Sequence, residues 1–211
     1  MIAEIIAIGS ELITGSTTNT NAQYLSRKLL ELGIEVKYHT AIEDDFNLLM
    51  DVFNLALNRA DLIITTGGLG PTEDDLTKEA ISTALGLELK LDLNMKQHIQ
   101  NIFCNTKRKM TENNLKQALK PAGAEFLENS IGTAPGIFIQ QDKKKIILLP
   151  GPPREVRLMF ENQVVPQLRS DYNILTRSVN LVGIGESQVE TRLMELDLDP
   201  INTRFATFAR D

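Results

Sequence analysis

Short, mostly apolar runs alternate with amphipathic segments through the first part of the chain. The short runs predict strands buried in a sheet; they are residues 5–9, 35–42 and 61–68. The longer segments carry apolar residues at helical spacing; they are residues 22–33, 46–60 and 74–85. Strands and helices that alternate in this way form parallel β-α-β units, with helices on both faces of the sheet. We therefore expect an α/β fold.

The second half of the chain predicts a more mixed set of elements. Residues 91–119 predict two helices that separate near residues 109–111. Residues 136–140 and 145–150 predict a β-hairpin. A helix is expected after Pro153, because proline suits the first helical turn.

The last part of the chain reads as a separate segment. Residues 177–196 predict a strand, a glycine-marked turn and a helix. We place a domain over residues 1–169 and a partial second domain over residues 170–211. So short a segment can hardly bury a core of its own. We therefore expect the chain to be part of a longer protein and to form a homo-oligomer.

The composition is that of an acidic globular protein. The chain has 211 residues, and 28 Asp and Glu outnumber 22 Lys and Arg, so the formal net charge is −6. This balance argues against a nucleic-acid partner, and the basic run at residues 107–109 is expected to be solvated surface. Cys104 is the single cysteine, the first residues do not resemble a signal peptide, and no apolar run is long enough for a membrane span. We expect a cytoplasmic protein.

Three glycine-containing loops follow predicted strands, at residues 9–21, 65–77 and 150–155. Ligands of an open parallel sheet bind beyond the carboxyl ends of its strands, so these loops are candidates to form one site. Glycines in the central loop leave room for backbone N–H groups to approach an anion such as a phosphate. They are Gly67, Gly68 and Gly70.

Acidic residues follow these glycines, and two interpretations of them stay open. Thr72, Asp74 and Asp75 could cap the next helix and complement its dipole. Alternatively, backbone amides hold a phosphate while a carboxylate holds a divalent cation beside it. Asp44 and Glu11 follow other strands, and two interpretations stay open for them as well. Each could have a structural role, or could be a second carboxylate that binds a metal or activates water.

Five longer motifs resemble a known family: GSELITGSTTNTNAQYLSRKLLELG, TTGGLGPTEDDLTKEA, MTENNLKQAL, GTAPGI and LLPGPPREVRLMFENQVVP. In this order, over about residues 2–168, they resemble the N-terminal domain of the competence/damage-inducible CinA family. That domain is similar in turn to the molybdopterin-binding proteins MoaB, MogA and MoeA. The resemblance implies a three-layer α/β/α sandwich with a mainly parallel sheet, followed by a partial KH-like segment. RNA binding is not implied, because residues 183–186 lack the GxxG clamp of RNA-binding KH modules.

The resemblance also implies a chemistry. The molybdopterin-binding relatives carry two aspartates used in adenylyl transfer, and Asp44 and Asp75 match them, with Thr77 close to the second. Leu69 stands where MogA-type proteins have threonine. This difference weakens the inference that the chain acts on the same substrate as those proteins. In CinA proteins the domain is associated with metal-dependent hydrolysis of ADP-ribose to AMP and ribose 5-phosphate.

These implications give a leading hypothesis and two alternatives. The leading one is an ADP-ribose pyrophosphatase that uses Mg²⁺, Mn²⁺ or Co²⁺, with Asp44 and Asp75 as catalytic and metal-binding residues and Asp74 as an alternate metal ligand. The first alternative is molybdopterin binding or adenylyl transfer. The second is a non-enzymatic nucleotide-binding or assembly module of a longer CinA-type protein. Beside the loop glycines, the nucleotide-binding candidates are Ser10, Glu11, Asn19, Thr72, Thr133 and Gly151.

Overall fold

A computed structural model describes residues 1–107, 109–168, 179–196 and 207. The chain divides into two compact units, Met1–Ile174 and Leu175–Asp211. The predicted boundary between residues 169 and 170 lies outside the described residues and stays a prediction.

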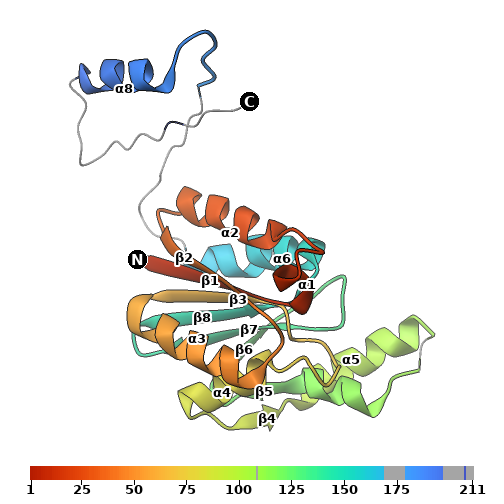
Figure 1. The fold of residues 1–211 in the computed structure, drawn as a ribbon. Helices are drawn as coiled ribbons and strands as arrows, with labels where there is room; N and C mark the ends of the chain where they lie inside the picture. Colours follow the sequence, from red (N-terminus) through yellow and green to blue (C-terminus); the bar gives the residue numbers. More distant parts are fainter. Residues whose placement is uncertain (108, 169–178, 197–206, 208–211) are drawn as a thin grey trace. The chain divides into compact units, whose positions relative to one another are not determined.

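A six-stranded sheet forms the centre of the first unit (Figure 1). Its strands are β1 Ile2–Ile8, β2 Glu35–Ile42, β3 Leu62–Thr66, β6 Glu125–Leu127, β7 Gly136–Gln141 and β8 Lys144–Leu149. Their order in the sheet is β2-β1-β3-β8-β7-β6. β1 is parallel to β2 and β3, and β3 is parallel to β8, whereas β7 is antiparallel to both of its neighbours. The predicted mainly parallel α/β fold is therefore confirmed.

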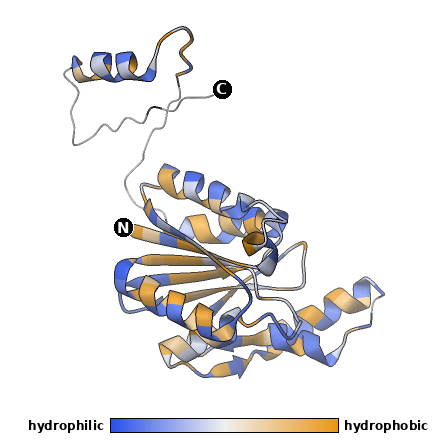
Figure 2. Cartoon of the chain, in the orientation of Figure 1, coloured by the Kyte–Doolittle hydropathy of each residue, from blue (hydrophilic) through white to orange (hydrophobic). Residues whose placement is uncertain are grey.

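Helices cover both faces of this sheet. They are α2 Thr20–Glu31 and α6 Pro153–Met159 on one face, and α3 Phe46–Arg59 and α4 Thr77–Leu85 on the other (Figure 1). Along β1, Ile5 packs in the core beneath α2 and α6, and Ile6 packs in the core beneath α3 and α4. Successive side chains of a strand point to opposite faces, so most positions of a strand that is buried on both faces are apolar. Figure 2 shows this pattern as hydrophobic strands between helices of mixed polarity.

Smaller elements complete the chain. A second sheet pairs β4 Leu89–Leu91 with β5 Leu119–Pro121 in antiparallel orientation. The remaining elements are the helices α1 Ser10–Ile13, α5 Leu93–Asn105, α7 Val165–Leu168 and α8 Glu186–Met194, the 3-10 helix η1 Glu112–Ala118 and the π-helical turn η2 Phe160–Val164.

Three predicted elements differ from the structure. The helix predicted from residue 74 begins at Thr77, because Asp75 first closes a turn by accepting hydrogen bonds from Thr72. The second helix predicted within residues 91–119 is the tighter helix η1, after which the chain extends into β5. Residues 179–185 form no strand, and the rest of that predicted strand lies outside the described residues. The KH-like assignment stays a prediction.

A buried carboxylate fixes α3 to the sheet. The side chain of Glu4, in β1, is fully buried. Its Oε1 accepts hydrogen bonds from Arg59 Nη2 at 2.7 Å and Thr40 Oγ1 at 2.8 Å, and its Oε2 accepts one from Arg59 Nε at 2.9 Å. The guanidinium of Arg59 also stacks 4.0 Å from the centre of the Tyr38 ring. Two parallel bonds to one carboxylate are the strongest arrangement for such a pair, and they raise the pKa of Arg59.

We expect Arg59→Met to lower the free energy of unfolding, because it removes the charged partner of the buried Glu4 side chain. Urea unfolding at pH 7 measures this loss. The double variant Glu4→Gln with Arg59→Met removes the charge itself and should recover part of the lost stability. A double variant that is no more stable than the single one would contradict the electrostatic explanation.

Candidate active site

A pocket of about 350 Å³ opens where the parallel strands end. Loops that follow four neighbouring strands supply most of its lining: Gly9 follows β1, Asp44 follows β2, Gly67 follows β3 and Gly151 follows β8. η1 and the loop before β7 complete it. The three glycine-containing loops predicted from the sequence thus meet at one pocket.

Most of the predicted site residues line this pocket. They are Glu11, Asp44, Gly67, Gly68, Gly70, Asp75, Thr133 and Gly151. The other four predicted residues are not in the lining, and three of them hold nearby parts of the chain in place. Ser10 donates to Asp44, Asn19 caps α2 by accepting from the Ala22 N–H, and Thr72 donates to Asp75. Asp74 is exposed to solvent.

The glycines of the central loop are needed first for the path of the chain. Gly67 and Gly68 have φ angles of 106° and 66°, which side chains strongly disfavour. A Cβ on Gly67 would collide with the Ile8 carbonyl, and one on Gly68 would collide with Thr77 Oγ1. The Gly67 N–H donates to the Leu149 carbonyl at 3.0 Å, so this amide is already engaged. Of the predicted amide cradle, the N–H groups of Gly68 and Gly70 are the better candidates.

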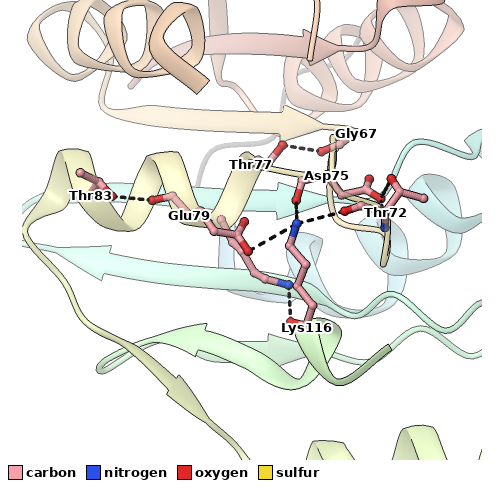
Figure 3. Close-up of polar contacts among 8 residues, drawn as sticks. Gly67, Thr72, Asp75, Thr77, Glu79, Thr83 and Lys116 are labelled. Atoms are coloured by element: carbon pink, nitrogen blue, oxygen red, sulfur yellow. Dashed lines mark hydrogen bonds and ion pairs between the residues drawn. The ribbon is translucent and has the colours of Figure 1, made fainter. Parts of the chain in front are cut away.

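The two aspartates, which lie on different loops, are held in similar ways. Asp44 Oδ2 accepts from the N–H of Ser10 at 3.0 Å and from its Oγ at 3.2 Å. Asp75 Oδ2 accepts from the N–H of Thr72 at 2.8 Å and from its Oγ1 at 2.5 Å (Figure 3). Within the described chain, no hydrogen bond reaches Oδ1 of either residue. Each carboxylate is therefore oriented through one oxygen and keeps the other available for a ligand.

The charge of the pocket is strongly negative. Its lining includes four carboxylates, those of Glu11, Asp44, Asp75 and Glu155, and no Lys, Arg or His. A free phosphate would be repelled there, whereas a divalent cation would be attracted. The described residues contain no group of three or more His, Cys, Asp or Glu that could hold a metal by themselves. The carboxylates therefore fit a hard ion such as Mg²⁺ that takes one or two protein ligands and fills its shell with water and phosphate oxygens.

Two polar residues of the pocket lining were not predicted from the sequence. Gln117, in η1, is buried, and its Nε2 donates to Thr133 Oγ1 at 3.3 Å. Glu155, in α6, accepts a hydrogen bond from the Asn129 amide at 2.6 Å. The same Asn129 side chain accepts from the N–H groups of Ile131 and Gly132, so it shapes the loop that carries Thr133. Both residues lie within motifs that carry the family resemblance. Membership of these motifs is the sequence signal that could have identified them.

Lys78 lies buried behind the acidic loop, in the first turn of α4. Its ammonium donates to the Lys116 carbonyl at 2.5 Å. Burial lowers the pKa of Lys78 to about 8, and the nearby Glu79 carboxylate opposes this change in part. Lys78 in the folded chain therefore loses its proton more readily than an exposed lysine does.

The chain is similar to known proteins of one family. A mainly parallel sheet with a pocket of glycine and acidic loops at its carboxyl edge defines a small-molecule-binding α/β domain. The chain belongs to the family described as the probable molybdopterin binding domain, whose family model matches residues 4–170. A pterin-like or nucleotide-like small molecule is the kind of ligand this family suggests.

Individual proteins similar to this chain include a curated relative and two solved structures. A curated competence-damage inducible protein from Natranaerobius thermophilus is 50% identical over 94% of this chain and 50% of its own length. The chain spans about half the length of the curated relatives that it matches. The crystal structure of CinA from Thermoplasma acidophilum, described as a protein of unknown function, is similar with a TM-score of 0.74 and 32% identity, over 81% of this chain and 100% of that one. MoaB from Thermus thermophilus has the same fold, with a TM-score of 0.51 and 19% identity, over 79% of this chain and 90% of that one.

Other predictions concern location and assembly. In the part of the chain that the structure describes, no helix has both the length and the apolar character to cross a membrane. The cytoplasmic location and the homo-oligomer stay predictions.

We expect the two neighbouring glycine loops to respond differently to an added methyl group. Gly68→Ala should lower the free energy of unfolding by about 2 kcal/mol, because alanine is strained at this φ and its Cβ collides with Thr77. Gly151→Ala is the matched control, since a Cβ there would have the Gly67 Cα at 3.8 Å as its one close neighbour. The free energy of unfolding of Gly151→Ala should stay within about 0.5 kcal/mol of that of the parent. If chemical denaturation showed equal losses of stability for the two variants, the conformation at Gly68 would not be the cause of the loss.

We also expect the free energy of unfolding to rise with pH between about pH 8 and the ordinary lysine pKa of 10.5, through Lys78. In this window the unfolded chain still holds a proton that the folded chain has lost, so raising the pH favours the folded state. Below pH 8 both states are protonated and this contribution is constant. Unfolding of the parent and of Lys78→Met, measured from pH 7.5 to pH 10, isolates the effect. Parallel curves for the two proteins would contradict the lowered pKa.

Proposed function

We propose that this domain is a metal-dependent nucleotide pyrophosphatase that hydrolyses ADP-ribose to AMP and ribose 5-phosphate. One observation carries the proposal: four carboxylates and no basic side chain line a pocket next to a glycine turn at the carboxyl edge of the sheet. Such a pocket suits a diphosphate that arrives together with a divalent cation. The long motifs shared with CinA proteins support ADP-ribose as the substrate.

The chain's own groups divide the work in this proposal. Asp44 and Asp75 would hold a divalent ion such as Mg²⁺, Mn²⁺ or Co²⁺, and that ion would neutralise charge on the diphosphate and make a water molecule more acidic. The N–H groups of Gly68 and Gly70 face the phosphate oxygens. The buried amide of Gln117 and the hydroxyl of Thr133 would contact the sugar or the base.

The reaction consumes one water. Its oxygen forms a bond to one phosphorus, and the bond from that phosphorus to the bridging oxygen breaks. One phosphate monoester leaves with the bridging oxygen and the other keeps the oxygen of the water. Whichever of Asp44 and Asp75 orients the water accepts its proton.

The family match favours a second candidate, the binding or adenylylation of molybdopterin. Leu69 weighs against adenylyl transfer, since its side chain lies in the hydrophobic core and cannot replace a hydroxyl of the MogA type. Incubation with ADP-ribose and Mg²⁺, Mn²⁺ or Co²⁺, followed by detection of AMP, tests the leading proposal. Pyrophosphate release from MgATP and molybdopterin would favour adenylyl transfer instead. Tight binding of ADP-ribose without turnover would favour a non-enzymatic module.

We expect Asp75→Asn to lower the rate of ADP-ribose hydrolysis on the order of a hundredfold, because it removes a charged metal ligand. Thermal unfolding should change little, since the asparagine oxygen can still accept the hydrogen bonds from Thr72. The exposed neighbour Asp74 provides the comparison, and Asp74→Asn should keep its activity within about twofold of the parent. The opposite ranking of the two variants would move the metal from Asp75 to Asp74.

A further inference from the structure

Lys116 projects from η1 toward the acidic loop (Figure 3). Its Nζ donates to the Thr72 carbonyl at 3.1 Å and to the Asp75 carbonyl at 2.5 Å. It also lies 3.7 Å from Glu79 Oε1, and its side chain is 21% exposed. One ammonium group thus contacts both ends of the four-residue turn that presents Asp75.

The main chain of Lys116 is itself held from the other side. Its carbonyl accepts the hydrogen bond from the buried Lys78 ammonium at 2.5 Å. α4, η1 and the acidic loop are therefore joined in series through two lysines. The next residue of η1, Gln117, lines the pocket.

The loop needs such a support for two reasons. Its main-chain closure, from the Asp75 N–H to the Thr72 carbonyl, is long at 3.4 Å. Three consecutive acids, Glu73, Asp74 and Asp75, repel one another within the same turn. A cation bonded to the carbonyl groups of the turn offsets both effects.

We propose that Lys116 is the positioning residue of the candidate active site. It fixes the main chain of residues 72–75 so that the Asp75 carboxylate faces the pocket. Lys116 bonds to carbonyl oxygens and forms no ion pair with the Asp75 side chain, so the carboxylate stays available to a metal. The effect of Lys116 on metal binding rests on the proposed function.

Removing Lys116 should change the metal affinity in opposite directions, depending on whether this residue positions the loop or acts only through its charge. If Lys116 acted only through its charge, then removing that charge beside a cation site would tighten metal binding. If Lys116 positions the loop, its loss leaves Asp75 mobile and weakens metal binding. Mn²⁺ alone, titrated with the protein and followed by the electron paramagnetic resonance signal of the free ion, distinguishes these outcomes.

We expect Lys116→Met to weaken Mn²⁺ binding about tenfold relative to the parent. Lys116→Arg, which keeps the charge and the donors, should restore most of the affinity. The matched control is Lys120→Met, because Lys120 forms its ion pair with Asp92 and is not in the pocket lining. Its Mn²⁺ affinity should equal that of the parent. If Lys116→Met does not fold, Lys116→Gln, which keeps a donor without the charge, replaces it under the same criteria.

Amide hydrogen exchange supplies a readout that does not depend on activity. The N–H groups of Gly70 and of residues 72–77 should exchange faster in Lys116→Met than in the parent or in Lys120→Met. Unchanged loop exchange, or Mn²⁺ binding that is equal to or tighter than that of the parent, would overturn the positioning role. If the parent neither binds Mn²⁺ nor hydrolyses ADP-ribose, the proposed function fails, and loop exchange alone decides whether Lys116 positions the loop.

Discussion

Four parallel strands must end at the same edge of one sheet, and this constraint places most of the loops that line the candidate site. β3 lies between β1 and β8, and all five of its residues are buried. The chain leaves β3 at Gly67, where the N–H donates to the carbonyl of Leu149, the last residue of β8, and a Cβ would strike the Ile8 carbonyl of β1. A residue with a side chain has no room to pass between these two neighbours. The glycine loop is thus a consequence of the parallel sheet before it is part of any binding site.

The same constraint explains why much of the fold could be predicted from the sequence. Strands buried on both faces, such as β1 and β3, are read from short apolar runs without reference to the rest of the chain. Once the strands are taken as parallel, their loops must share an edge, so the convergence of the loops around Gly9, Gly67 and Gly151 followed from topology. Asp44 and Asp75 could be chosen because each follows a strand and matches a position of a recognised motif.

The remaining site residues depend on contacts between distant parts of the chain. Lys78 and Lys116 are 38 positions apart, and Lys116 and Asp75 are 41 positions apart. In sequence, each of these lysines reads as an ordinary polar position of an amphipathic helix. Gln117 gives no local signal either, since its burial depends on how η1 packs beside the pocket. The start of α4 was misplaced for a related reason, because a side chain-to-backbone turn at Asp75 competes with the helix.

The acids that follow the glycine loop also determine how ligands would bind. With the Gly67 amide engaged and four carboxylates around the pocket, the chain offers a free diphosphate few donors and much repulsion. A divalent cation reverses that balance, and a diphosphate in turn supplies ligands that the carboxylates alone do not provide. Each partner therefore raises the affinity of the pocket for the other, and by linkage the two effects must be equal in size. Under the proposed function, a pocket of this charge would select the metal complex of a nucleotide over the nucleotide itself, and Lys116 would support the loop from behind without reducing that selectivity.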